Sequence, residues 1–172
     1  STPEITPSQH LVQEQFEAAL QYDRSRIADP EYRLAIVQRA YKPYTSRYES
    51  GYIRFSRGLH SVLTRRHEEN ATFLSGRRVI RSGSPEDLLF KIRGLDLDQD
   101  VGQVVLPPVS MLMEGIAQSD LPLTDKLARV AGVAGVMTAE AQAFSDGNTR
   151  IARTTHDFIK LGPTKLKGGR VF

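Results

Sequence analysis

Cysteine is absent from the 172 residues of this chain. Its absence excludes a thiol nucleophile, a zinc site with cysteine ligands, an iron–sulfur cluster and a disulfide-stabilised scaffold. Long hydrophobic runs are also lacking, since no stretch approaches the roughly 20 apolar residues that cross a bilayer. The start of the chain has neither the basic nor the apolar region of a signal peptide. We therefore expect a soluble protein without a membrane partner, either cytoplasmic or exported without a cleavable signal.

The charge of the chain is small in total but unevenly distributed. The net charge is +3, and 17 of the 23 basic residues are arginine. Residues 47–93 and 147–172 each carry a net charge of +5, whereas residues 94–146 carry −6. Arginine suits bidentate recognition of phosphate or carboxylate, although a solvated surface also accounts for many arginines. The arginine pairs have no interleaved aromatic residues and no reading-helix motif, so a nucleic-acid partner is not expected.

Apolar residues recur at helical spacing along most of the chain, which predicts an all-α fold. Proline and capping residues mark several helix starts, among them Ser8, Asp29-Pro30 and Ser84-Pro85. We divide the chain into N-terminal helices at 1–44, a main domain at 45–161 and a basic tail at 162–172. The expected helices cover about residues 7–27, 30–42, 47–70, 84–93, 107–121, 124–144 and 148–161.

Two segments depart from the usual amphipathic pattern. Residues 124–144 have almost no polar face over several turns, which predicts a buried central helix. Residues 72–83 place Val79 and Ile80 between glycines, which is typical of a short strand or β-hairpin. Neighbouring helices could approach the central helix closely at its small residues Ala128, Gly132, Gly135 and Ala139.

The most informative stretch runs from Phe144 to Arg153, where the central helix ends and a new helix begins. Gly147 permits a tight turn, and backbone N–H groups at the start of the next helix attract an anion. Arg150 and Arg153 lie three residues apart and share one helical face near that start. Asp146 supplies a hard oxygen ligand of the kind that holds Mg²⁺ together with phosphates. The stretch therefore predicts a site for a metal-bound polyphosphate, and the alternative is a plain helix corner with exposed arginines.

This stretch resembles the signature of the Fic (Fido) family, which is His-x-Phe-x-Asp/Glu-Gly-Asn-Gly/Lys-Arg-x-x-Arg. The chain reads Gln142-Ala143-Phe144-Ser145-Asp146-Gly147-Asn148-Thr149-Arg150-Ile151-Ala152-Arg153 at these positions. Leu106-Pro107-Pro108 resembles the proline-initiated helix of the family, and Ser75–Gly83 resembles its hairpin flap. The resemblance is specific over about 105–160 and looser over 45–104. It implies an all-α, Fic-like helical domain at 45–161, with a buried central helix and a short β-hairpin flap.

The resemblance also implies an activity. Most members bind ATP with Mg²⁺ and transfer AMP to a Ser, Thr or Tyr hydroxyl of a target protein, and some transfer other phosphate-linked groups. This nucleotidyltransferase reaction is called AMPylation. By resemblance, Asp146 would hold Mg²⁺, Phe144 would be a buried anchor, and Gln142 would occupy the position of the catalytic base. The phosphates would be bound by Gly147, Asn148, Thr149, Arg150 and Arg153, with Arg150 also catalytic. The flap would align the target protein by strand addition at Arg78, Val79 and Ile80.

Two positions depart from the family signature. Gln142 stands where the family has its general-base histidine, and an amide cannot accept a proton near neutral pH. Loss of a general base typically costs about 10²- to 10⁴-fold in rate. We therefore expect weak or absent transfer, as in a pseudoenzyme. Thr149 replaces Gly or Lys and could restrict close approach to the phosphates. The alternative function is a non-catalytic Fic-like module that binds a partner protein or a phosphate compound.

The remaining histidines offer no evident substitute for the missing base. His156 lies six residues after Arg150, which is too far along the helix to reach the phosphates. His10, His60 and His67 have no motif around them, and we expect each to be structural or on the surface.

A second candidate metal site is weaker. Asp96, Asp98 and Asp100 alternate as in a Ca²⁺ loop, but Pro107 stands where such a loop has its final Glu. We expect a solvated acidic loop at this position.

Overall fold

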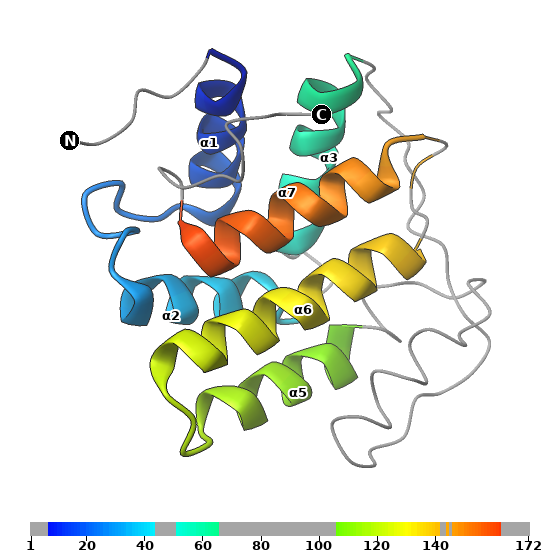
Figure 1. Ribbon diagram of the computed structural model, residues 1–172. Helices are drawn as coiled ribbons and strands as arrows, with labels where there is room; N and C mark the ends of the chain where they lie inside the picture. The colour runs from blue at the N-terminus through cyan, green and yellow to red at the C-terminus, as the bar shows by residue number, and fades with distance from the viewer. Residues whose placement is uncertain (1–6, 44–50, 66–105, 142–143, 145, 163–172) are drawn as a thin grey trace.

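The regular secondary structure in the part of the chain that the structure describes is helical (Figure 1). This computed structural model describes residues 7–43, 51–65, 106–141, 144 and 146–162. Those ranges contain six helices and no strand, which confirms the predicted all-α class. The predicted flap at 72–83 and the predicted helix at 84–93 lie outside the described residues. The helices are α1 (Pro7–Leu20), α2 (Pro30–Ala40), α3 (Gly51–Thr64), α5 (Leu106–Ala117), α6 (Leu123–Ala141) and α7 (Asn148–Leu161).

Local sequence signals place the start of α2 where it is predicted. The carboxylate of Asp29 accepts a hydrogen bond from the backbone N–H of Glu31 at 3.1 Å. Pro30 follows in the first turn, where its missing N–H has no helical partner to lose. A capping side chain and a proline therefore begin this helix as the sequence indicates.

The boundaries of α1 differ from the prediction. This helix ends at Leu20 rather than near Ile27, and Ser8 lies inside it rather than at its N-cap. Gln21 adopts a left-handed φ of 52°, which interrupts the helix. Ile27 is still buried. It fits the apolar spacing of α1 because it belongs to the core, but it lies in the turn that follows the helix.

The helices share one core, and its aromatic residues come from both ends of the chain. Figure 1 shows α6 and α7 side by side in opposite directions, with α5 next to α6 and α1 beside α3. Phe16 of α1 stacks on Phe158 of α7 with ring centroids 3.9 Å apart, and it also contacts Phe55 of α3 at 5.3 Å. All three rings are at most 1% exposed. The N-terminal helices are thus packed directly against the helix that carries the signature arginines.

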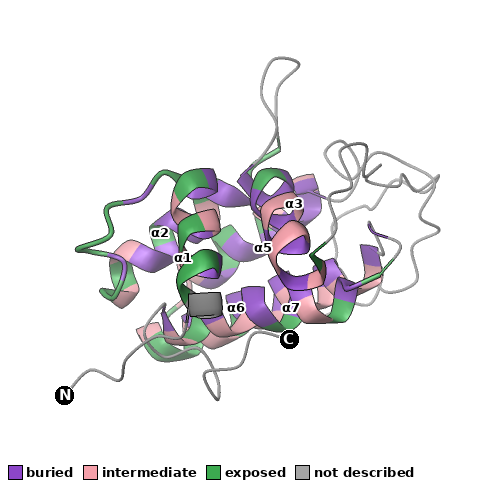
Figure 2. Cartoon of the chain, turned by 90° about the horizontal axis from the view of Figure 1, so that it is seen from above, coloured by how far each residue is buried: buried purple, intermediate pink, exposed green. Residues whose placement is uncertain are grey.

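α6 is buried along one side rather than all round. Ala128, Gly132 and Gly135 are only half-buried, and a Cβ placed on Gly132 would meet no heavy atom within 4 Å. Figure 2 shows both buried and partly exposed residues along this helix. The predicted all-round burial is therefore wrong, because a side of α6 that carries small residues rather than polar ones lies partly on the surface. None of the helices in the described ranges combines the length and the hydropathy needed to cross a membrane.

Arg33 of α2 is a charged residue in the interior, only 4% exposed. Its guanidinium donates hydrogen bonds to the carbonyl oxygens of Ile27 at 3.0 Å and Ala28 at 3.1 Å. It also donates to the carbonyls of Ile159 at 2.8 Å and Lys160 at 3.4 Å. These last two carbonyls belong to the C-terminal end of α7, where carbonyls lack helical partners and the helix dipole attracts a cation. Arg33 therefore fixes the end of α7 against α2.

Replacement of Arg33 is expected to destabilise the whole fold. Arg33→Met keeps much of the apolar stem but removes every hydrogen bond of the guanidinium and leaves buried carbonyls without a donor. We expect the free energy of unfolding to fall by about 2–4 kcal/mol in urea denaturation followed by circular dichroism. Arg26→Ala is the matched control, because Arg26 is exposed and its main contact is with the ring of Tyr32 at 4.2 Å. Such a contact is worth about 0.5–1 kcal/mol, so the control should lose little stability. Equal losses of unfolding free energy in the two variants would contradict the role of Arg33.

Candidate functional site

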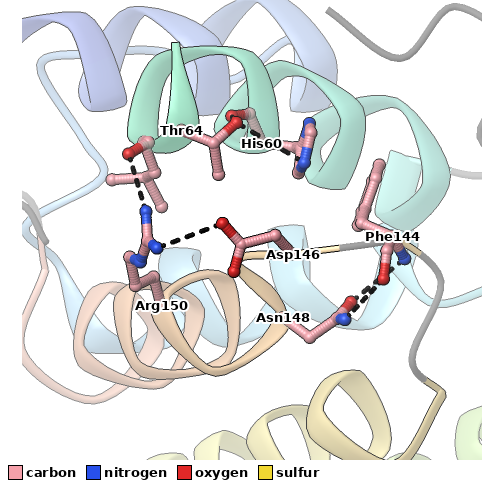
Figure 3. A network of polar contacts seen from close by, with 7 residues as sticks. His60, Thr64, Phe144, Asp146, Asn148 and Arg150 are labelled. Atoms are coloured by element: carbon pink, nitrogen blue, oxygen red, sulfur yellow. Dashed lines mark hydrogen bonds and ion pairs between the residues drawn. The ribbon is translucent and has the colours of Figure 1, made fainter. Parts of the chain in front are cut away.

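The turn between α6 and α7 is closed by a single asparagine side chain. The Phe144 N–H donates to Asn148 Oδ1 at 3.1 Å, and Asn148 Nδ2 donates to the Phe144 carbonyl at 2.7 Å (Figure 3). Asparagine can make both bonds because its side chain carries a donor and an acceptor. Both residues are buried. The side chain of Asn148 therefore shapes the turn around the buried Phe144.

Gly147 starts α7 in a conformation that other residues rarely adopt. Its φ is 85° and its ψ is 4°, and a Cβ at this position would lie 2.5 Å from Cγ2 of Thr64 on α3. The first helical hydrogen bond of α7 runs from the Ile151 N–H to the Gly147 carbonyl at 3.0 Å. Backbone N–H groups before that bond point out of the helix start, where the helix dipole favours an anion. The glycine is therefore required by both its backbone angle and its closeness to α3.

Arg150 links the turn to the end of α3. Its Nη2 lies 3.4 Å from Oδ2 of Asp146, and its Nη1 donates to the Leu63 carbonyl at 3.3 Å (Figure 3). The exposed fractions of the two side chains are 37% for Arg150 and 51% for Asp146. Ion pairs that are this exposed contribute little, about 0–1 kcal/mol, because water screens them. The structure thus brings the predicted metal ligand and the predicted catalytic arginine together in a pair that a bound anion can displace at low cost.

The other predicted phosphate ligands fall into two groups, one exposed to solvent and one buried. Thr149 and Arg153 are exposed, whereas Gly147 and Asn148 are buried. The buried pair forms the turn, so its contribution to phosphate binding would come from backbone N–H groups. The exposed residues are the ones whose side chains can reach a ligand from solvent.

Metal binding at this turn would depend on the ligand as well as on the protein. Among the described residues, no group of three His, Asp or Glu side chains lies close enough to hold a metal ion. Asp146 offers one solvent-exposed carboxylate beside Arg150. That donor set fits Mg²⁺, which is commonly held by one or two carboxylates together with phosphates and water. It does not fit a metal site built from protein ligands alone.

The sequence alone did not connect His60 with this turn. His60 is 1% exposed, and its ring stacks on that of Phe144 with centroids 4.2 Å apart and an angle of 8° between the planes. Its position one residue after Leu59, on the apolar side of α3, was the available signal. A helix position does not reveal which ring lies opposite it, so the stacking partner could not be found from the sequence.

Several sequence predictions fall outside the described residues or away from the turn. Gln142 and the flap residues Arg78, Val79 and Ile80 lie outside the described ranges. His156 contacts its neighbour, with Nδ1 3.1 Å from Oδ1 of Asp157.

Comparisons of the chain with known protein families, with curated proteins and with solved structures give no match.

Gly147→Ala is expected to lower the free energy of unfolding by about 2 kcal/mol or more. About 1–2 kcal/mol comes from the left-handed backbone, and the contact with Thr64 Cγ2 adds to it. Thr64→Ser removes that methyl group and keeps the hydroxyl, so in the double variant we expect the loss to shrink to the backbone part. Gly132→Ala is the control, since its open helical position should make alanine stabilising by about 0.5–1 kcal/mol. If the double variant loses the sum of the unfolding free energies lost by the two single variants, the predicted clash between Gly147→Ala and Thr64 is contradicted.

Proposed function

We propose that this chain is a Fic-like protein that binds a nucleoside triphosphate with Mg²⁺ at the start of α7. The proposal includes transfer of AMP, or of another phosphate-linked group, to a hydroxyl of a target protein. The observation that carries it is the exposed pair of Asp146 and Arg150, with side chains 3.4 Å apart beside the first turn of a helix. A carboxylate, an arginine and a helix start together suit a metal-bound polyphosphate.

Each residue of the turn would have its own role in nucleotide binding and transfer. Asp146 would hold Mg²⁺, which neutralises phosphate charge when it is bound. Arg150 would exchange the Leu63 carbonyl and the Asp146 carboxylate for phosphate oxygens, and Arg153 would pair with phosphate one turn further along. The target hydroxyl would attack the α-phosphorus, and pyrophosphate would leave as AMP becomes attached. In such reactions most of the catalysis is positioning and charge stabilisation.

Gln142 limits the rate that this site could reach. The attacking hydroxyl must lose its proton, and a glutamine side chain cannot take it near neutral pH. Its carbonyl oxygen could still orient the hydroxyl by accepting a hydrogen bond. We therefore propose weak or absent transfer by the chain as it stands.

A second candidate is a nucleotide-binding or partner-binding module without catalysis. Gln142 in the sequence favours this possibility, because the loss of a base affects transfer and leaves the ligands for phosphate in place. The two candidates share the phosphate site and differ in the transfer step.

Nucleotide binding is the first test. In calorimetry with Mg²⁺ and ATP, we expect the wild-type protein to bind and Arg150→Ala to lose about tenfold or more in affinity, because a charged hydrogen bond is worth about 1.5–3 kcal/mol. Arg129→Ala is the matched control, since Arg129 is an exposed arginine on α6 outside the turn. Thermal unfolding of Arg150→Ala checks that loss of the Leu63 contact leaves the fold intact. Absence of nucleotide binding by the wild-type protein would overturn the proposal.

Group transfer is the second test. Wild type and Gln142→His are incubated with a cell lysate, Mg²⁺ and ATP labelled at either the α- or the γ-phosphate. We expect the variant to label target proteins about 10²- to 10⁴-fold faster than wild type, with the α-label, because histidine supplies a general base. Labelling with the γ-phosphate alone would indicate phosphoryl transfer instead. Nucleotide binding without labelling by either protein would favour the non-catalytic module.

A further inference from the structure

A buried histidine of α3 lies directly against the turn that carries the candidate site. The His60 ring is parallel to that of Phe144 within 8°, at a centroid distance of 4.2 Å (Figure 3). A Cβ built on Gly147 would also lie 3.8 Å from Cδ2 of His60. The ring of His60 therefore contacts the turn at Phe144 and leaves little space beside Gly147.

The burial of His60 defines what it can do. With 1% of its surface exposed, it has no access to a nucleotide or to a target hydroxyl, and it cannot replace the missing base. On its own helix, the Thr64 hydroxyl donates to the backbone carbonyl of His60 at 2.7 Å and lies 3.5 Å from Nε2 of the ring. The observed role of the buried ring is to offer a flat face on which Phe144 stacks.

The turn connects the ring of His60 with the candidate ligands. The backbone of Phe144 is bound on both sides by Asn148, and its ring is bound by His60. Phe144 is therefore fixed at its backbone and its side chain, and Asp146 follows two residues later. A shift of the Phe144 ring would therefore be expected to shift the nearby backbone that carries Asp146.

We propose that His60 is a positioning residue for the metal–polyphosphate site, and that it acts through its stack on Phe144. The inference rests on the proposed function, because it concerns how Asp146 is placed to hold Mg²⁺ with phosphate. A flat aromatic ring is the required property, so phenylalanine can substitute at this position and a branched aliphatic residue cannot. Outer contacts of this kind typically change metal affinity about 10- to 100-fold.

The experiment separates metal-dependent binding from binding in general. ATP is titrated by calorimetry into wild type, His60→Leu and His60→Phe, once with Mg²⁺ and once with a chelator in its place. We expect His60→Leu to lose about tenfold in affinity for ATP with Mg²⁺, with unchanged affinity for ATP alone. His60→Phe is expected to bind as wild type does under both conditions. Ile53→Ala is the control, because it removes buried volume from the same helix about 10 Å away along its axis. We expect Ile53→Ala to lower the melting temperature and to leave both affinities unchanged.

Each outcome decides the inference. Wild-type affinity in His60→Leu, with binding lost in Arg150→Ala, overturns the role of His60 and leaves the proposed function standing. Equal loss with and without Mg²⁺, or loss in Ile53→Ala as well, shows a general structural effect and overturns the inference. If His60→Leu does not fold, His60→Phe decides, since a tenfold loss in that variant excludes ring stacking as the cause. Absence of nucleotide binding by wild type overturns the inference and the proposed function together.

Discussion

The placement of α7 depends on the buried guanidinium of Arg33. This group holds the last carbonyls of α7 and the carbonyls of residues 27–28 in one cluster of hydrogen bonds. A helix of 14 residues is a stiff rod about 20 Å long. When its C-terminal end is fixed against α2 and its side is packed on α6, the place where it starts is fixed as well. The geometry of the turn at residues 144–148 is therefore set partly from the far end of the helix.

The start of α7 is held by a different kind of arginine contact. Arg33 and Arg150 both donate to carbonyls at the C-terminal end of a helix, α7 for the first and α3 for the second. Arg33 is 4% exposed, whereas 37% of the Arg150 side chain is exposed. A buried guanidinium cannot leave without stranding polar groups away from water. A half-exposed one can exchange a carbonyl and a carboxylate for another anion, because water solvates whatever it releases. The first contact suits a structural role and the second suits a binding site.

The sequence predicts most of the helices because their signals are local. Asp29-Pro30 begins α2 and Gly147 precedes α7, and in both cases the capping or backbone requirement lies within a few residues. Arg33 could not be assigned in this way, since two of its partners lie 126 and 127 residues away. The same reason hides the stack of His60 on Phe144. The candidate ligands Asp146 and Arg150 were found because they lie in one short stretch of sequence at a helix start.

The described contacts of the turn come from α3 and from the turn itself. Phe144 is held by Asn148 and His60, and Gly147 is held against Thr64. Under the proposed function, a base at residue 142 would be a requirement separate from these contacts. If the proposed function holds, transfer and ligand binding would depend on different residues, and one could be lost without the other. A substitution at Gln142 would then report on the proposed transfer, whereas substitutions at Gly147 or Asn148 report on the fold of the turn.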